Sequence, residues 1–251
     1  MNLISDFYST TVGKKIVMAV TGLVLFLFVV GHMLGNLKMF AGVDPASGRY
    51  KLDLYAELLR SIGEGLIGHE TFLWIVRGAL LLCLVLHVKA ALALAALNAK
   101  AKPIAGHRRH YESANPASRT MLYGGLFILF FVVYHILHLT TGHVHFRGFI
   151  HGQVYANVFA GFQSSAVTAF YVLAMGALAL HLYHGTWSLF QTLGVDSPAW
   201  NRPLRLIAKI VAVVLFLGFC SVPIAASLKL ISSPIEAVTF QLEGQARAAH
   251  P

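Results

Sequence analysis

The sequence predicts an all-α membrane protein with five transmembrane helices, forming a single domain over residues 1–251. Hydrophobic residues make up 57% of the chain and charged residues only 12%, about half the charged share of an ordinary soluble domain. Five stretches reach the ~20 mostly apolar residues that a spanning helix needs. Basic residues stand in short blocks between these stretches, so the net charge of +9 indicates membrane topology rather than nucleic-acid binding.

The first helix is expected at about residues 16–40, because no charged residue stands between Lys15 and Lys38. The second is expected at about residues 72–98, although two basic residues interrupt it. The glycine-containing loop between them, residues 41–70, is expected to carry a short surface helix. No short apolar segment with a cleavage site precedes the first helix, so a removable signal peptide is not expected.

The third helix is expected at about residues 120–144. The fourth is expected at about residues 165–192, inside the long uncharged stretch 148–195. The fifth is expected at about residues 206–231, where Pro223 is expected to introduce a kink.

Lysine and arginine gather before the first helix and in the second and fourth loops, and the other loops have fewer of them or balance them with acids. The residues are Lys14, Lys15, Lys100, Lys102, Arg108, Arg109, Arg119, Arg202 and Arg205. Because such blocks stay on the cytoplasmic side, the N-terminus is expected in the cytoplasm. With five spans, the C-terminus is then expected outside.

Histidines inside the expected helices are the main functional signal: His32, His87, His135, His138, His181 and His184. Ionisable residues at membrane depth are costly and usually functional, although a single one often only donates a hydrogen bond to a neighbouring helix. Four consecutive helices each carry one. His32 and His135 lie past the midpoints of helices that run outward, so both lie towards the outer side of the membrane. His87 and His181 lie past the midpoints of helices that run inward, so both lie towards the cytoplasm. At about 1.5 Å rise per residue, this predicts two pairs at two levels.

Two facing imidazoles supply the two axial nitrogens of a b-type haem, and the core of a helical bundle is a common cofactor site. Zinc would need three or four ligands at one point. Cys83 and Cys220 lie inside apolar runs, and the chain has no CxxCH segment, so covalently attached haem is not expected. The pairs therefore predict two non-covalent b haems in a bundle of the first four helices.

Four segments resemble the cytochrome b subunits of dihaem succinate:quinone oxidoreductases: TGLVLFLFVVGHMLGNL, LLCLVLHVKAAL, FFVVYHILHL and ALHLYHGTWSLF. The resemblance covers roughly residues 10–231 in helix order, histidine placement and loop charge. Its most specific part is His-x-x-x-Gly-x-Trp-Ser, from His181 to Ser188. It implies a bacterial cytoplasmic membrane and assigns the axial ligands, with His32 and His135 on a distal haem and His87 and His181 on a proximal haem.

The resemblance further implies that the chain anchors a succinate dehydrogenase or fumarate reductase. It would pass electrons between an iron–sulfur subunit and a quinone, with menaquinone expected. The dicarboxylate chemistry would lie on a separate flavoprotein subunit. In agreement, the sequence has neither a G-x-G-x-x-G fingerprint after a strand nor cysteine clusters for iron–sulfur ligation.

Other residues have roles that the sequence leaves open. His138 and His184, one helical turn from the favoured ligands, are alternative ligands, although hydrogen bonding between helices or to a haem propionate is the role expected of them. A quinone pocket near the distal haem would draw on residues such as His138, His143 and Tyr134, although nothing in the sequence selects them over His145 or His151. Candidates for pairing with propionates, or for snorkelling to lipid headgroups, are Arg77, Lys89 and Arg119.

Two other classes of protein compete with this interpretation. The first is the b-type cytochrome anchor of another membrane dehydrogenase or hydrogenase, which would also carry histidine pairs. The second is a histidine-containing transporter, for which acidic residues or broken helices at the midplane are typical. The HxxxGxWS segment favours the succinate family over the first, and the absence of Asp and Glu from the apolar cores argues against the second.

Overall fold

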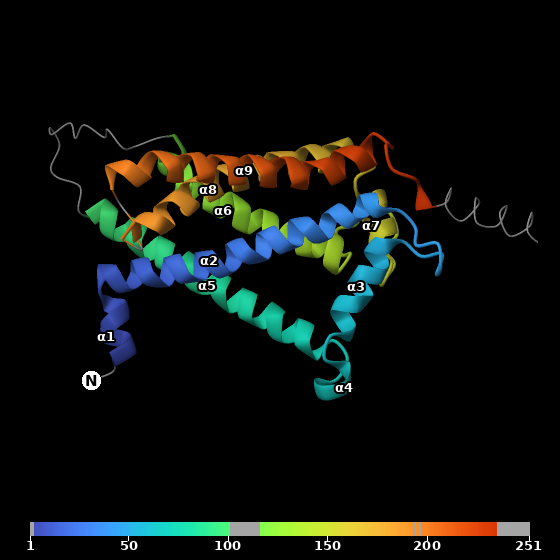
Figure 1. Ribbon diagram of the computed structural model, residues 1–251, viewed down its shortest axis with the longest axis horizontal. Helices are drawn as coiled ribbons and strands as arrows, with labels where there is room; N and C mark the ends of the chain where they lie inside the picture. The colour runs from blue at the N-terminus through green and yellow to red at the C-terminus, as the bar shows by residue number, and fades with distance from the viewer. Residues whose placement is uncertain (1–2, 101–115, 193, 196, 235–251) are drawn as a thin grey trace, which may run out of the picture. The chain divides into compact units, whose positions relative to one another are not determined.

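The computed structural model of the chain is all-helical in the part that it describes, residues 3–100, 116–192, 194–195 and 197–234 (Figure 1). These residues contain no β-strand, and an isolated antiparallel bridge joins Val43 to Tyr50. The basic residues Lys102, Arg108 and Arg109 of the second loop lie outside the described residues.

Five helices of the described part are long and apolar enough to cross a membrane. They are α2 (Thr11–Asn36), extended by the 3-10 turn η1 (Leu37–Ala41); α5 (Thr71–Lys100); α6 (Pro116–His135), extended by the π turn η2 (Ile136–Thr140); α8 (Ser165–Thr192); and α9 (Pro198–Ser227). The predicted all-α class and the five apolar helices are therefore confirmed, and the chain is a membrane protein.

Helices α2, α6 and α9 begin earlier than expected from their apolar stretches. At α2, the Thr10 hydroxyl accepts a hydrogen bond from the backbone N–H of Gly13 at 2.9 Å, which is the usual way to start a helix. At α9, Ser197 occupies the equivalent position and Pro198 the first helical position. Hydropathy misses these turns because they are polar, and α9 then remains helical through Pro223.

The third predicted helix ends early. Regular α-helix stops at His135, and the π turn carries the chain to Thr140, where the backbone N–H of Thr141 donates to the Ile136 carbonyl at 3.0 Å. Wide turns of this kind change the helical phase and are frequent at functional sites. The turn holds His138, so the side chains after His135 do not follow regular α spacing.

Short helices complete the chain: α1 (Leu3–Ser9), α3 (Lys51–Ser61), α4 (Glu64–Ile67) and α7 (Val154–Gly161). The loop at 41–70 was expected to carry one surface helix and carries two. Helix α7 was not predicted, because it lies in an uncharged apolar stretch with no start signal at its first residue.

The chain divides into two compact units. Unit 1 consists of Met1–Val30, Ile75–Phe127 and Ala177–Val214, and unit 2 of Gly31–Trp74, Ile128–Gly176 and Leu215–Pro251. His87, His181 and His184 belong to unit 1. His32, His135 and His138 belong to unit 2.

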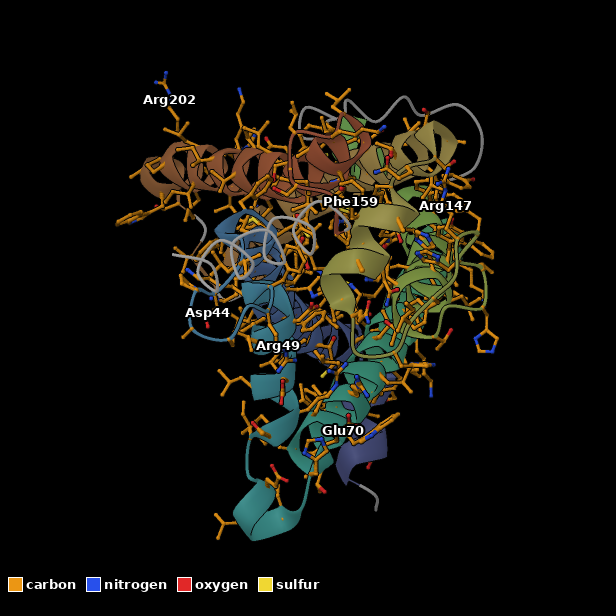
Figure 2. All side chains as sticks on the ribbon, turned by 90° about the vertical axis from the view of Figure 1, so that its right-hand side faces the viewer. Asp44, Arg49, Glu70, Arg147, Phe159 and Arg202 are labelled. Atoms are coloured by element: carbon orange, nitrogen blue, oxygen red, sulfur yellow. The ribbon has the colours of Figure 1, made fainter. Side chains whose placement is uncertain are left out.

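In unit 2, helices α3 and α7 pack against each other. The Asp53 carboxylate accepts a hydrogen bond from the backbone N–H of Tyr155, near the start of α7, at 2.9 Å. The rings of Tyr50 and Tyr155 stack with centres 3.5 Å apart, and the Tyr155 hydroxyl donates to the Ser232 carbonyl at 2.8 Å. Figure 2 labels Phe159, a buried residue of this α7 helix.

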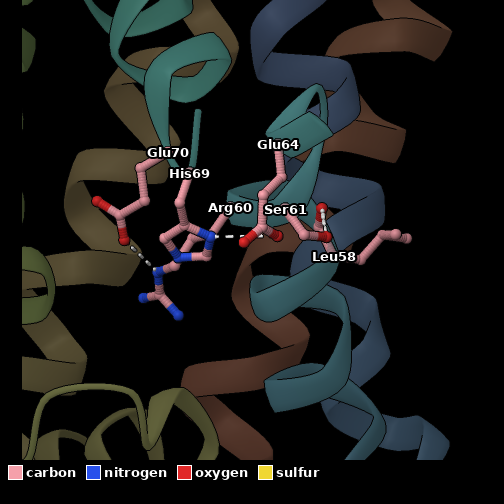
Figure 3. A network of polar contacts seen from close by, with 6 residues as sticks. All are labelled: Leu58, Arg60, Ser61, Glu64, His69 and Glu70. Atoms are coloured by element: carbon pink, nitrogen blue, oxygen red, sulfur yellow. Dashed lines mark hydrogen bonds and ion pairs between the residues drawn. The ribbon is translucent and has the colours of Figure 1, made fainter. Parts of the chain in front are cut away.

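An ion pair and a histidine–carboxylate contact lie in the connection from α3 through α4 to α5 (Figure 3). Arg60 pairs with Glu70 at 3.3 Å, and the backbone N–H of Glu70 donates to the Arg60 carbonyl at 2.8 Å. His69 lies 3.5 Å from Glu64. Because these groups are partly exposed, each contact is worth at most about 1 kcal/mol.

Candidate functional site

Unit 1 brings together one histidine from each of two long helices. The ring centres of His87 on α5 and His181 on α8 are 6.2 Å apart, with an interplanar angle of 65°. Nδ1 of His87 lies 3.2 Å from the Met18 carbonyl of α2. A carbonyl can only accept, so Nδ1 carries the hydrogen and Nε2 keeps its lone pair. His87 is therefore held in the tautomer that can bind a metal through Nε2.

The Thr21 hydroxyl adds a second contact to the same nitrogen. It donates to the Val17 carbonyl at 2.6 Å, which leaves its oxygen free to accept, and it lies 3.4 Å from Nδ1 of His87. Nδ1 of His181, in contrast, is buried without a hydrogen-bond partner among the described residues. The two imidazoles of this pair thus differ, because only His87 has a hydrogen bond from Nδ1 to α2.

Bare glycine backbone faces both rings in unit 1. A Cβ at Gly22 of α2 would lie 3.2 Å from Cε1 of His87, and one at Gly125 of α6 would lie 3.6 Å from Cε1 of His181. The first distance is tighter than an ordinary van der Waals contact. Four helices therefore surround the pair, two giving imidazoles and two giving glycines.

Unit 2 holds the second pair. The ring centres of His32 on α2 and His135 on α6 are 5.8 Å apart, and the rings are nearly perpendicular at 86°. The ring centre of Phe219 on α9 lies 6.0 Å from that of His32, and the ring centre of Phe131 lies 5.8 Å from that of His135. Nδ1 of His135 is 3.3 Å from the hydroxyl of Tyr171 on α8. Aromatic side chains therefore surround this pair.

The alternative ligand in unit 2, His138, is completely buried. Its Nδ1 lies 2.9 Å from the Tyr171 hydroxyl, and its ring stacks on His145 with centres 5.1 Å apart. Its Nε2 has no hydrogen-bond partner among the described residues and faces α7, where a Cβ at Gly161 would lie 3.0 Å away. Close backbone thus covers the nitrogen that would have to reach a metal.

The alternative ligand in unit 1, His184, lies against Trp187 with ring centres 6.1 Å apart. Trp187 packs with Leu204 and Ala208 of α9, and the Arg205 guanidinium lies 4.2 Å from its ring centre. The tryptophan of the HxxxGxWS segment therefore joins α8 to α9.

The spacing of both pairs fits an iron with two imidazole ligands. A metal–nitrogen bond to imidazole is about 2 Å long, as in zinc sites, and the ring centre lies roughly an ångström behind the nitrogen, which places two opposed ring centres ~6 Å apart. The observed separations are 6.2 Å and 5.8 Å. In the described part of the chain, no three His, Cys, Asp or Glu side chains converge as metal ligands. The histidines are thus arranged in pairs.

The remaining predicted residues lie in different surroundings. Tyr134 stacks on His138 with ring centres 5.4 Å apart, whereas His143 is exposed and its Nδ1 lies 2.7 Å from the Thr141 hydroxyl. The Lys89 ammonium group lies 5.7 Å from the ring centre of Tyr8. The side chain of Arg119 lies outside the described residues.

The sequence gives little warning of the groups that contact the imidazoles from other helices, namely Met18, Gly22, Gly125 and Tyr171. Gly22 and Gly125 look like ordinary small residues of membrane helices. Tyr171 carried a weak signal, because a buried tyrosine hydroxyl needs a partner.

Comparison with known proteins gave no match to any family model, to any curated protein or to any solved structure.

Proposed function

We propose that this chain is the dihaem cytochrome b subunit that anchors a succinate dehydrogenase or fumarate reductase complex in the bacterial cytoplasmic membrane. It transfers electrons between the iron–sulfur subunit and a quinone, with menaquinone the expected one. The observation that carries the proposal is the pairing of histidines from different membrane helices at 6.2 Å and 5.8 Å. The resemblance of the four helix segments supplies the family.

In this proposal, His87 and His181 bind the proximal haem and His32 and His135 the distal one. When bound, haem supplies one-electron redox chemistry. The two imidazoles of each pair would both bind the haem iron, and iron held by two such ligands would carry electrons rather than bind oxygen. The Met18 carbonyl orients His87, and Gly22 and Gly125 leave room beside the rings.

The resemblance to the cytochrome b subunits implies two soluble partner subunits, and the basic residues of the loops indicate the side on which they dock. A flavoprotein subunit carries the dicarboxylate chemistry, and the iron–sulfur subunit docks on the cytoplasmic side, where the basic loops are expected. The chain itself supplies the membrane anchor, the haem ligands and the quinone pocket.

The first test is a pyridine haemochrome assay on the purified complex, combined with a reduced-minus-oxidised spectrum with succinate as the reductant. We expect about two b haems per chain, as two pairs require, both reducible by succinate. No haem would refute the proposal. Two haems that succinate does not reduce would instead indicate the anchor of another dehydrogenase or a hydrogenase.

Ligand variants test the pairs separately. We expect H87A or H181A to remove the proximal haem and to leave the distal one, and H32A or H135A to do the reverse. The matched control is H184A, which replaces the histidine one turn after His181 and should keep both haems. Loss of haem from H184A with retention in H181A would overturn the assignment on α8.

A further inference from the structure

The hydroxyl of Tyr171 lies between two histidines that are one helical turn apart. It is 2.9 Å from Nδ1 of His138 and 3.3 Å from Nδ1 of His135. The tyrosine ring is buried, and Phe131 and Phe162 meet it edge-on with ring centres 5.0 Å and 4.8 Å away. The hydroxyl is therefore held between the two nitrogens.

A phenol hydroxyl has one hydrogen to donate, and its oxygen can also accept. Between two ring nitrogens it donates to one and accepts from the other, so the two imidazoles must carry their hydrogens on different atoms. The shorter distance, to His138, suits donation by the hydroxyl, because O–H donors form shorter bonds than N–H donors. His135 then donates from Nδ1 to Tyr171 and keeps the lone pair on Nε2. His138 accepts at Nδ1 and carries its hydrogen on Nε2.

We propose that Tyr171 is a positioning residue that selects His135, and not His138, as the distal haem ligand. It keeps His135 in the tautomer that binds iron through Nε2. It gives His138 the opposite tautomer, whose hydrogen-bearing Nε2 faces the backbone of Gly161. The inference rests on the proposed function and goes beyond it, because nothing in the resemblance assigns a role to this tyrosine.

The hydrogen bond has consequences for the haem. An imidazole that donates from Nδ1 to an acceptor is a more basic ligand, and losing such an outer partner typically costs about 10–100-fold in metal affinity. A more basic ligand favours ferric iron, so the bond lowers the midpoint potential of the distal haem. Removing the hydroxyl should raise that potential.

The test compares Y171F with Y155F in the purified complex. Both variants lose one buried tyrosine hydroxyl in unit 2. The Tyr155 hydroxyl, however, donates to the Ser232 carbonyl and forms no hydrogen bond with a histidine of the described residues. Redox titration and low-temperature EPR report on each haem separately. The rate of haem transfer to apomyoglobin reports how tightly each haem is held.

We expect Y171F to raise the midpoint potential of the distal haem, to change its EPR signal and to release it about 10–100-fold faster. The proximal haem should be unchanged, and Y155F should leave both haems as in the wild type. A tyrosine that only packs would lower thermal stability in both variants and leave the distal potential unmoved, which would overturn the inference.

A second variant covers the case in which Y171F does not assemble. H138F removes the acceptor of the Tyr171 hydroxyl without touching His135, and should raise the distal potential by less than Y171F. An unmoved distal haem in H138F would also overturn the inference. A wild-type complex without haem would refute the proposed function itself, so the two failures are distinguishable.

Discussion

At the scale of single residues, the tautomer of an imidazole decides what it can do. His87 lies against a carbonyl that can only accept, so its Nδ1 must carry the hydrogen. His135 lies against a hydroxyl that can donate or accept, so its tautomer depends on His138 as well. The tautomer of His87 is therefore fixed by one hydrogen bond, whereas that of His135 depends on two hydrogen bonds through the Tyr171 hydroxyl.

Gly22 offers a sharp test of the space beside His87. A valine there would place its Cβ 3.2 Å from Cε1 of His87 and its γ-methyl groups around the ring. We expect G22V to lose the proximal haem and to destabilise the protein by about 1–3 kcal/mol through overpacking. Haem content and thermal unfolding of the complex measure these effects.

Gly31 is the matched control on the same helix. A Cβ there would have nothing within 4 Å, so G31V should retain both haems. Equal haem content in G22V and G31V would show that the space beside His87 is not needed.

At the scale of elements, the start of α7 depends on a carboxylate of α3. Asp53 accepts from the backbone N–H of Tyr155. Partial burial raises the pKa of Asp53 above its ordinary value. The Tyr155 and Val154 N–H groups, Arg49 and Arg60 oppose this shift. The folded protein therefore holds this proton more tightly than the unfolded chain does.

This difference predicts a pH dependence. Because the pKa of Asp53 is raised in the folded state, its contribution to stability is fully present below the unfolded pKa and is lost as pH rises through the folded pKa. We expect amide exchange at the start of α7 to become faster as pH rises through the folded-state pKa of Asp53, after correction for the intrinsic exchange rate.

The variant D53N keeps an oxygen acceptor for Tyr155 and removes the ionisation. It should therefore abolish that pH dependence while α7 stays protected. A D53N profile that still follows the wild type would assign the effect to another group.

Asp44, in the same unit, has a pKa that is shifted in the opposite direction from that of Asp53. Its side chain accepts from the hydroxyl and backbone N–H of Ser47 at 2.7 Å and 2.9 Å, and these bonds lower the pKa of Asp44. The turn that it caps, labelled by Asp44 and Arg49 in Figure 2, lies between η1 and α3.

At the scale of the whole molecule, orientation in the membrane is the main prediction. Basic residues near the start of α2 are expected on the cytoplasmic side, and the connection between η1 and α3 is expected outside. In a cysteine-free background made by C83A and C220A, an impermeant maleimide should label A46C in intact spheroplasts. It should label S9C only after the membrane is opened.

Both positions are exposed, so accessibility within the protein does not limit labelling. The reverse pattern, with S9C labelled from outside, would invert the topology. The iron–sulfur partner would then have to dock at the opposite face, and the assignment of proximal and distal haems would exchange.

How far the sequence could predict the molecule differs between fold and site. The long apolar stretches were sufficient for five helices, because backbone in hydrocarbon must satisfy its own hydrogen bonds. Helix ends were predicted less accurately, because the first turns of α2 and α9 are polar and were left out of the expected helices. Helix α7 was missed, because an apolar loop segment looks the same whether or not it is helical.

The all-α class, the five apolar helices and the histidines within them follow from the order of amino acids along the chain. The contacts between helices became visible only in the folded chain. Gly22 lies beside His87, Tyr171 lies between His135 and His138, and Gly161 lies over His138. The physical reason is that lipid is as apolar as the interior of a helical bundle. Hydropathy therefore marks where a membrane helix lies along the chain, but its rotation about its own axis follows only from packing against its neighbours.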